Sequence, residues 1–224
     1  MCNRYGYRHP LNALIDEFSE IGPVRWDRLE PNQPLDQIRP TDRAPVIRRT
    51  EEGAELAMLR WGLIPSFWTG PAGEWGRFRN ARTGRVEKNP FTNARSESIS
   101  KTSAYQGAYA HGRCLIPATE YFEWTRDPQT PKGRSLMWKF TVPGQPVFAF
   151  AGIWDRARTA DGVVESFALL TSAPGPDQAR YHEREPVVLA RTQWAAWLDP
   201  ANDMARTFKG SAAGSLSVEP FVEA

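Results

Sequence analysis

The sequence has few of the residues that build disulfide frameworks and metal centres. Its 224 residues include two cysteines, Cys2 and Cys114, and three histidines, His9, His111 and His182. Their positions show none of the short spacings that are typical of zinc sites. We therefore expect no structural disulfide, no metal and no cofactor, and any chemistry should come from the side chains of the chain itself.

A long hydrophobic run is also missing. No stretch of about eighteen or more apolar residues occurs, and no apolar segment precedes Asp16, so we expect neither a membrane span nor a signal peptide. The protein should be cytoplasmic, with no membrane partner. Because 41% of the residues are hydrophobic, the chain can bury a substantial core, and we expect a single domain over 1–224 and a monomer.

Excess charge is small. The net charge of +2 does not by itself indicate a nucleic-acid partner. Arginine, however, supplies 23 of the 28 basic side chains, and its planar guanidinium group suits phosphates and stacks on bases. Since an arginine-rich codon bias would give the same count, composition alone supports DNA binding only weakly.

The N-terminal cysteine offers an unusual nucleophile. If Met1 is removed, Cys2 carries a free α-amine beside its thiol, with reference pKa values of about 8 and about 8.5. The amine condenses with an aldehyde to an imine, and the thiol then closes a five-membered thiazolidine on the same carbon. The alternative is that position 2 merely holds a small residue compatible with methionine removal.

Secondary-structure signals favour an α+β fold. The hydrophobic spacing predicts a short helix within 10–21, a helix within 96–109, and a helix after Thr192. The second half is rich in β-forming residues, which predicts a curved, mainly antiparallel, barrel-like sheet flanked by short helices. The expected strands are 113–116, 121–125, 136–142, 147–154, 167–171 and 186–189.

Residues 69–90 lack hydrophobic periodicity and are rich in glycine and arginine, so we expect a surface loop inserted into the domain. This basic segment either extends a DNA-binding surface or is simply solvated. It contains a near-repeat, because Phe78-Arg79-Asn80-Ala81-Arg82 is similar to the segment 91–95, Phe-Thr-Asn-Ala-Arg. Only one of the two copies can occupy a given site.

Five blocks of sequence together resemble the SRAP family, the SOS-response-associated peptidases that are also called abasic-site processing proteins. The blocks are Met1-Cys2-Asn3-Arg4-Tyr5, Trp61-Gly62-Leu63-Ile64-Pro65, Asn93-Ala94-Arg95-Ser96-Glu97, the segment 113–118 followed by Phe122-Glu123-Trp124, and the segment 182–189, His-Glu-Arg-Glu-Pro-Val-Val-Leu. The resemblance runs from Met1 to about residue 200. Each block is weak alone, but their order and the cysteine at position 2 make the combination specific.

The resemblance implies a sensor that captures abasic sites in single-stranded DNA through a thiazolidine between Cys2 and the ring-opened sugar aldehyde. It also implies a possible strand-nicking lyase activity and a thiol autopeptidase activity that removes Met1. The family uses its Asn-Ala-Arg asparagine to hold the crosslink. We assign this role to Asn93 rather than Asn80, because the residues after Asn93 fit the family pattern.

Two further residues are candidates for proton transfer. Glu123 lies among apolar neighbours that can raise its pKa toward neutrality, although an outward-facing strand carboxylate would look the same in the sequence. His182 has an ordinary pKa of about 6.5 and is either a structural residue before a strand or a general base. The resemblance favours the catalytic interpretation for both residues.

The resemblance also assigns the DNA contacts. Arg4, Arg95 and Arg184 are the expected phosphate ligands, and Pro40, Phe67 and Trp68 are expected to stack on or wedge beside flanking bases. Most of the nine tryptophans should instead pack in the core. Two other hypotheses remain open, a thiol peptidase that uses Cys2 with His182 and a DNA-binding module that does not react.

Overall fold

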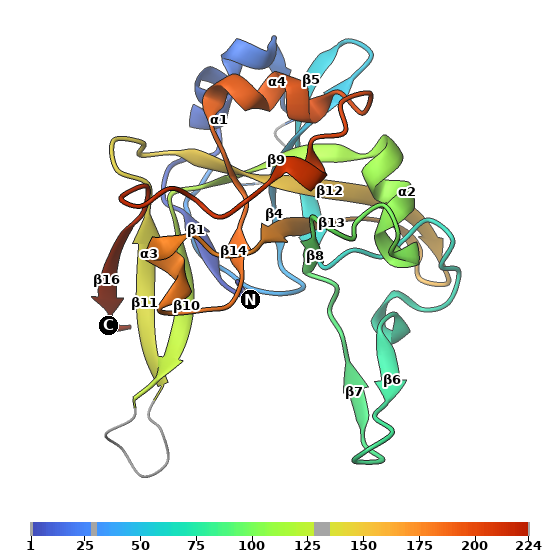
Figure 1. Cartoon of the computed structure of the whole chain (residues 1–224). Helices are drawn as coiled ribbons and strands as arrows, with labels where there is room; N and C mark the ends of the chain where they lie inside the picture. The colour runs from blue at the N-terminus through green and yellow to red at the C-terminus, as the bar shows by residue number, and fades with distance from the viewer. Residues whose placement is uncertain (1, 28–30, 128–134, 224) are drawn as a thin grey trace.

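The computed structural model describes residues 2–27, 31–127 and 135–223. Strands dominate, and short helices lie around them (Figure 1). The strands are β1 Tyr5–Tyr7, β2 Val24–Arg25, β3 Leu35–Ile38, β4 Arg43–Thr50, β5 Gly53–Trp61, β6 Arg77–Arg79, β7 Val86–Lys88, β8 Asn93–Arg95, β9 Arg113–Ala118, β10 Glu120–Arg126, β11 Ser135–Thr141, β12 Phe148–Thr159, β13 Gly162–Ser172, β14 Glu185–Pro186, β15 Val188–Leu189 and β16 Ser217–Phe221. The α-helices are α1 Ala13–Glu17, α2 Ser103–His111, α3 Pro176–Ala179 and α4 Trp194–Leu198.

Five strands close into a barrel. β13 pairs with β12, β12 with β9, β9 with β4, and β4 with β5, all antiparallel. A parallel pairing between β5 and β13, with Trp61 opposite Phe167, completes the ring. The predicted α+β fold, a curved and mainly antiparallel barrel-like sheet with short helices, is therefore confirmed.

The alternation of side chains along these strands makes two cores. Ala44 and Val46 of β4, with Leu59 and Trp61 of β5, belong to one apolar cluster that also includes Cys2. The side chains that point the other way form a second cluster, which the helices α1, α2 and α4 help to cover. Cys2 therefore joins the first of these cores.

A second sheet carries the N-terminal arm. Its strand order is β16-β11-β10-β1-β3, with antiparallel pairing throughout. Tyr5 of β1 pairs with Tyr121 of β10, so the arm that precedes β1 runs beside the end of β10. This pairing brings the segment that holds Cys2 beside the segment that holds Glu123, although the two are more than a hundred residues apart in the sequence.

The segment 69–90 differs from the expected loop, because it contains the β6–β7 hairpin. This hairpin projects away from the barrel (Figure 1). The expected helices are also shorter or shifted, with α1 at Ala13–Glu17 and α2 at Ser103–His111. None of the helices in the described ranges is long and apolar enough to cross a membrane.

Gly62 makes the turn after β5 that leads into the site, and it offers a test of this geometry. Its φ of +119° is a conformation that favours glycine, and a Cβ there would lie 2.6 Å from the Pro90 carbonyl oxygen. We expect Gly62→Ala to lower the free energy of unfolding by at least about 2 kcal/mol in urea titrations. Gly73→Ala, where a Cβ meets nothing within 4 Å, is the control and should change it by less than about 0.5 kcal/mol. Equal stability of the two variants would contradict this account of the turn.

Candidate functional site

Cys2 occupies a buried position at the start of the N-terminal arm. Its thiol donates a hydrogen bond to the Arg4 carbonyl oxygen at 3.4 Å, and the Phe122 N–H donates to the same oxygen at 3.0 Å. Burial raises the pKa of the Cys2 thiol well above its usual range, and the negative charge of Glu123 raises it further. The thiol is therefore protonated at neutral pH and must lose its proton to react as a nucleophile.

Asn93 of β8 also contacts the N-terminal arm. Its Nδ2 donates to the Cys2 carbonyl oxygen at 2.9 Å and to Thr92 Oγ1 at 3.0 Å. β8 pairs in parallel with β13, and the Tyr105 hydroxyl donates to the Asn93 carbonyl oxygen at 3.1 Å, so the asparagine backbone is fixed. The Asn93 Oδ1 atom is buried and has no hydrogen-bond partner among the described residues. A buried acceptor in this state costs about 1–3 kcal/mol, which a donor entering the site would recover.

The other copy of the repeat lies elsewhere. Asn80 sits in the β6–β7 turn, where its Oδ1 accepts hydrogen bonds from the Arg82 N–H at 2.9 Å and the Thr83 N–H at 3.2 Å. Its Nδ2 donates to Glu87 at 2.8 Å. Asn80 therefore shapes a turn, and the structure places Asn93 beside Cys2.

Glu123 lies on β10, close enough to Cys2 for its charge to affect the thiol. Its side chain is buried, and β10 pairs Glu123 with Trp138 of β11. Burial raises the pKa of Glu123 to about 7. A carboxyl group with this pKa can both donate and accept a proton at neutral pH, which is what a general acid/base requires.

His182 lies in the loop between α3 and β14. Its Nδ1 accepts a hydrogen bond from the Arg184 N–H at 2.9 Å, so in the neutral ring the proton resides on Nε2. Burial lowers the pKa of His182, and the imidazole is neutral at pH 7. The adjacent Tyr181 ring packs on Trp138, with 4.9 Å between ring centres, which sets the His182 loop against the strand pair that carries Glu123.

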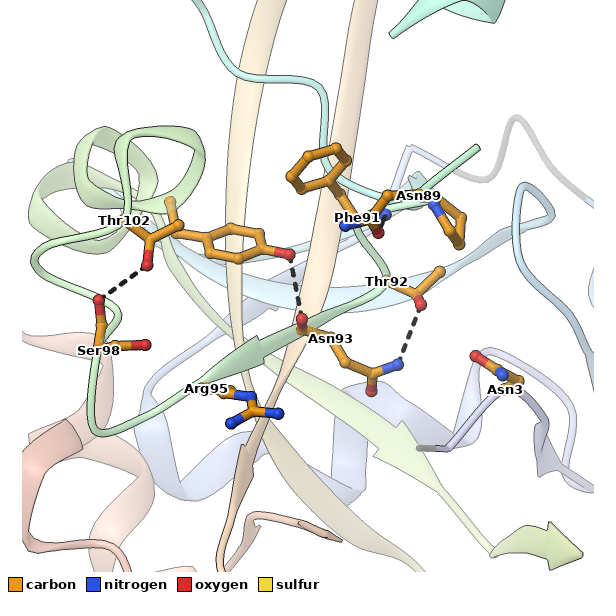
Figure 2. Close-up of a pocket in the computed structure, with 10 residues that line it drawn as sticks. Asn3, Asn89, Phe91, Thr92, Asn93, Arg95, Ser98 and Thr102 are labelled. Carbon is orange, nitrogen blue, oxygen red and sulfur yellow. Dashed lines mark hydrogen bonds between the residues drawn. The ribbon is translucent and has the colours of Figure 1, made fainter. Parts of the chain in front are cut away.

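A pocket of about 360 Å³ opens beside Asn93 (Figure 2). The lining residues come from the N-terminal arm, the segment around β8 and the start of α2, and they are Asn3, Asn89, Pro90, Phe91, Thr92, Asn93, Arg95, Ser98, Thr102 and Tyr105. Arg95 and Asn3 lie on either side of the Asn93 side chain (Figure 2). In the described part of the chain, no cluster of three His, Cys, Asp or Glu residues has a geometry that could hold a metal ion.

Arg184, one of the expected phosphate ligands, makes several contacts within the chain. Its guanidinium group is buried and forms two hydrogen bonds to the Glu97 carboxylate, at 2.7 Å and 2.9 Å. It also donates to the Thr171 carbonyl oxygen at 2.7 Å. These contacts join β13, the segment after β8 and the His182 loop, so Arg184 is placed to position other residues of the site.

The other two expected phosphate ligands have different surroundings. Arg95 is exposed at the pocket. Arg4 is half-buried, with its guanidinium group 5.2 Å from the centre of the Trp124 ring and in an ion pair with Glu223. Arg95 is thus accessible to an anion, whereas the Arg4 guanidinium group is already paired with a carboxylate.

The three residues expected to contact bases lie in two loops. Phe67 is 60% exposed, and Trp68 is half-buried against Trp75, with 5.2 Å between their ring centres. Pro40 is half-exposed in a turn that is tied to the end of β5, because the Thr41 N–H donates to the Trp61 carbonyl oxygen at 2.8 Å. The structure gives Phe67 the most accessible aromatic face of the three residues.

Comparisons with known proteins identify the family of this chain. A family model described as SOS response associated peptidase (SRAP) matches residues 1–220. The chain belongs to the SRAP family. Abasic site processing protein YoaM of Bacillus subtilis is 27% identical to this SRAP chain over 90% of this chain and 81% of YoaM. Abasic site processing protein YedK of Escherichia coli is 23% identical over 88% of this chain and 79% of YedK.

Solved structures share the SRAP fold of this chain. A crystal structure of a protein from Bacteroides thetaiotaomicron has a TM-score of 0.76 at 20% identity and covers 99% of this chain and 92% of its own. A crystal structure of a protein from Bordetella bronchiseptica has a TM-score of 0.74 at 23% identity, with 99% and 100% covered. At these identities the likeness concerns the fold alone.

Several residues that support the SRAP site had no signal in the sequence. Tyr105 anchors the Asn93 backbone from α2, and Thr171 anchors Arg184 from β13. Glu223 reaches Arg4 from the far end of the chain. An isolated tyrosine or threonine in a helix or strand is indistinguishable from ordinary core, so only the three-dimensional pairing reveals these roles.

The raised pKa of Glu123 makes a prediction about SRAP stability. The folded state holds this proton more tightly than the unfolded chain, whose carboxyl has its ordinary pKa of about 4.3, so the free energy of unfolding falls as pH rises from about 4 to about 7. Glu123→Gln should remove this slope and raise stability at pH 8 by about 3 kcal/mol, with little change at pH 4. Urea titrations of both proteins across this range provide the measurement. Parallel pH profiles for the two proteins would refute the shift.

The contacts of Arg184 predict a loss of stability that a phosphate ligand on the surface would not show. Arg184→Ala leaves the Thr171 carbonyl oxygen and part of the Glu97 carboxylate without a partner, and it should lower the free energy of unfolding by at least about 2 kcal/mol. Arg95→Ala, at an exposed position, should change it by less than about 0.5 kcal/mol. Unchanged stability in Arg184→Ala would contradict the positioning role.

Proposed function

We propose that this SRAP protein binds single-stranded DNA that contains an abasic site and forms a covalent thiazolidine crosslink through Cys2 after Met1 has been removed. The names of its relatives, which are abasic site processing proteins, point to this class of lesion. The observation that carries the proposal is the surroundings of Cys2: Asn93 Nδ2 donates to its carbonyl oxygen at 2.9 Å, and its thiol is affected by the charge of Glu123, a carboxyl group with a pKa near 7. No metal or cofactor is part of the reaction.

The proposed reaction needs only groups that the chain and the lesion supply: the amine and thiol of Cys2 and the aldehyde of the abasic sugar. The ring-opened abasic sugar carries an aldehyde, which the Cys2 α-amine attacks to give a carbinolamine and then, with loss of one water, an imine. The thiol adds to the imine carbon, so a C–S bond forms, the nitrogen gains a proton and the thiol loses one. Glu123 can move that proton, because its pKa lies near neutrality.

Asn93 would hold the adduct. Its Nδ2 already binds the Cys2 carbonyl oxygen, which fixes the nucleophile, and its Oδ1 can accept a hydrogen bond from the sugar hydroxyl or the thiazolidine N–H. Arg95 at the pocket rim would bind an adjacent phosphate. Phe67 and Trp68 would stack on flanking bases, a contact worth about 1–3 kcal/mol per base without sequence preference.

Lyase activity would compete at the imine stage. A base that removes the proton beside the imine carbon allows the 3′ phosphate to leave, and the neutral imidazole of His182 is the candidate base. Closure of the thiazolidine consumes the imine and protects the strand. The peptidase alternative would use the Cys2 thiol as the nucleophile with His182 as its base, and it does not require a free α-amine.

The free α-amine is the decisive requirement. Protein with Met1 removed should form a covalent band with a single-stranded oligonucleotide that bears an abasic site, on a denaturing gel. Cys2→Ala should give no thiazolidine, and a form with extra residues before Cys2 should lose the band although its thiol is intact. An extended form that crosslinks as well as the trimmed protein would refute the mechanism, and cleavage of an added peptide would favour a peptidase.

The two repeat copies give a matched pair of variants. Asn93→Ala removes the amide beside Cys2 and should slow crosslinking by about tenfold to a hundredfold, which corresponds to about 1.4–2.7 kcal/mol. Asn80→Ala alters only the hairpin turn and should crosslink at the wild-type rate under saturating DNA. Rates from quenched single-turnover reactions give the comparison, and the reverse order would assign the role to Asn80.

A further inference from the structure

The β6–β7 hairpin concentrates positive charge outside the pocket. Residues 77–88 include five basic side chains and one acidic side chain, a net charge of +4, although the whole chain carries only +2. The five basic side chains, all exposed, are Arg77, Arg79, Arg82, Arg85 and Lys88. The remaining residues together carry a net charge of −2, the difference between +2 and +4, so the hairpin concentrates positive charge relative to the rest of the chain.

The pairing register places three of these positive side chains on the same face of the hairpin. Residues directly opposite each other in an antiparallel pair point to the same side. The pairs are Arg77 with Lys88, Phe78 with Glu87 and Arg79 with Val86. One face therefore carries three cations, and the acidic residue lies on the other face, where Asn80 donates a hydrogen bond to it.

Only one of these cations has an ion-pair partner in the described chain. Arg77 contacts Glu74 at 2.7 Å, and Arg79 donates to the Gly84 carbonyl oxygen at 2.7 Å. Arg82 and Arg85 extend from the turn with no ion pair to any described residue. Four positive groups thus lack a compensating carboxylate, which favours an anionic partner.

The hairpin is rooted in the wall of the pocket. The Asn89 N–H donates to the Gly76 carbonyl oxygen at 2.8 Å, and a Cβ at Gly76 would lie 2.0 Å from the Asn89 carbonyl oxygen, so the two strands meet closely at the root. Trp75 packs on Phe91, with 4.9 Å between ring centres. Asn89 and Phe91 also line the pocket beside Asn93, so the root fixes where the hairpin starts relative to the reaction site (Figure 2).

Exposed aromatic rings accompany the charge. Phe78 on the hairpin is 48% exposed, and Phe67, which packs edge-on against Trp75 at the root, is 60% exposed. Exposed rings next to arginines are the combination that binds unpaired bases and their phosphates. A duplex keeps its bases stacked inside, so these rings favour a single strand.

From these observations we propose that the hairpin is an accessory arm that binds the phosphates of single-stranded DNA beyond the pocket. The proposal rests on the proposed function and deepens it, because it assigns DNA length dependence and salt dependence to residues outside the reaction site. Arg79, Arg82 and Arg85 supply the contacts, and they take no part in the chemistry at Cys2.

The test compares two charge-matched variants on DNA of two lengths. The triple variant Arg79→Gln, Arg82→Gln, Arg85→Gln neutralises the arm, and Arg158→Gln, Arg206→Gln, Lys209→Gln neutralises three exposed cations elsewhere. Each protein is titrated against single-stranded oligonucleotides of about 6 and about 20 nucleotides, with a central tetrahydrofuran that cannot react, in fluorescence anisotropy at several salt concentrations. A duplex of the longer length is a third probe.

The arm variant should bind the longer strand about 10- to 100-fold more weakly in 0.1 M salt, and its slope of log affinity against log salt should be less steep by about 2. Its affinity for the short strand should stay within about twofold, and the control variant should match the wild type on both strands. Equal losses on both lengths, no loss on the longer strand, or a loss seen only with duplex would overturn the proposal.

Crosslinking separates this proposal from the proposed function. With a reactive abasic site in the short strand, wild-type protein and the arm variant should crosslink at the same rate at saturating DNA. If neither protein crosslinks while the length-dependent loss of affinity persists, the proposed function is wrong but the DNA-binding role of the hairpin is supported. If both crosslink and the affinities do not differ, the arm fails and the function stands.

Discussion

The hydrogen bond from Asn93 Nδ2 to the Cys2 carbonyl oxygen is the contact on which the site depends. It joins β8, held in parallel against β13, to an arm that β1 pairs with β10. Without it, only the pairing of β1 with β10 would offset the loss of conformational entropy when the short N-terminal segment becomes ordered. With it, Cys2 is held by contacts to both sheets.

Burial shifts the pKa values of the groups around Cys2 and also lowers the stability of the folded state. The same apolar surroundings that keep the Cys2 thiol protonated raise the pKa of Glu123 into the neutral range, because both groups lose stabilisation by water when charged. Asn93 Oδ1, which has no hydrogen-bond partner within the described ranges, adds a further unsatisfied group. Such conflicts between stability and local chemistry are expected where a protein must bind a ligand that is not yet present. The barrel, with its filled interior and closed edge, provides the stability that offsets them.

Much of this arrangement could be predicted from the sequence, and the reasons differ between residues. Strands such as β12 and β13 follow from runs of β-forming residues, and the family blocks mark Cys2, Asn93, Glu123 and His182. The barrel-like sheet could be predicted, but the strand pair that closes it could not, because the parallel β5–β13 pairing leaves no local pattern. The hairpin at β6–β7 was expected as a loop, since three-residue strands rich in arginine lack the hydrophobic alternation that signals a strand. The contacts of Arg184 could not be predicted for a related reason, because a sequence does not reveal that Glu97 and Thr171 converge on its guanidinium group.

The identity of the covalent bond tests the central claim most directly. Protein with Met1 removed is incubated with single-stranded DNA that carries an abasic site, and the product is analysed by intact mass spectrometry and peptide mapping without any reducing agent. A thiazolidine predicts a mass equal to protein plus DNA minus one water, with the adduct on the peptide that begins at Cys2 and no free thiol on that residue. A product that survives only after borohydride reduction, or that maps to a lysine, would contradict the account.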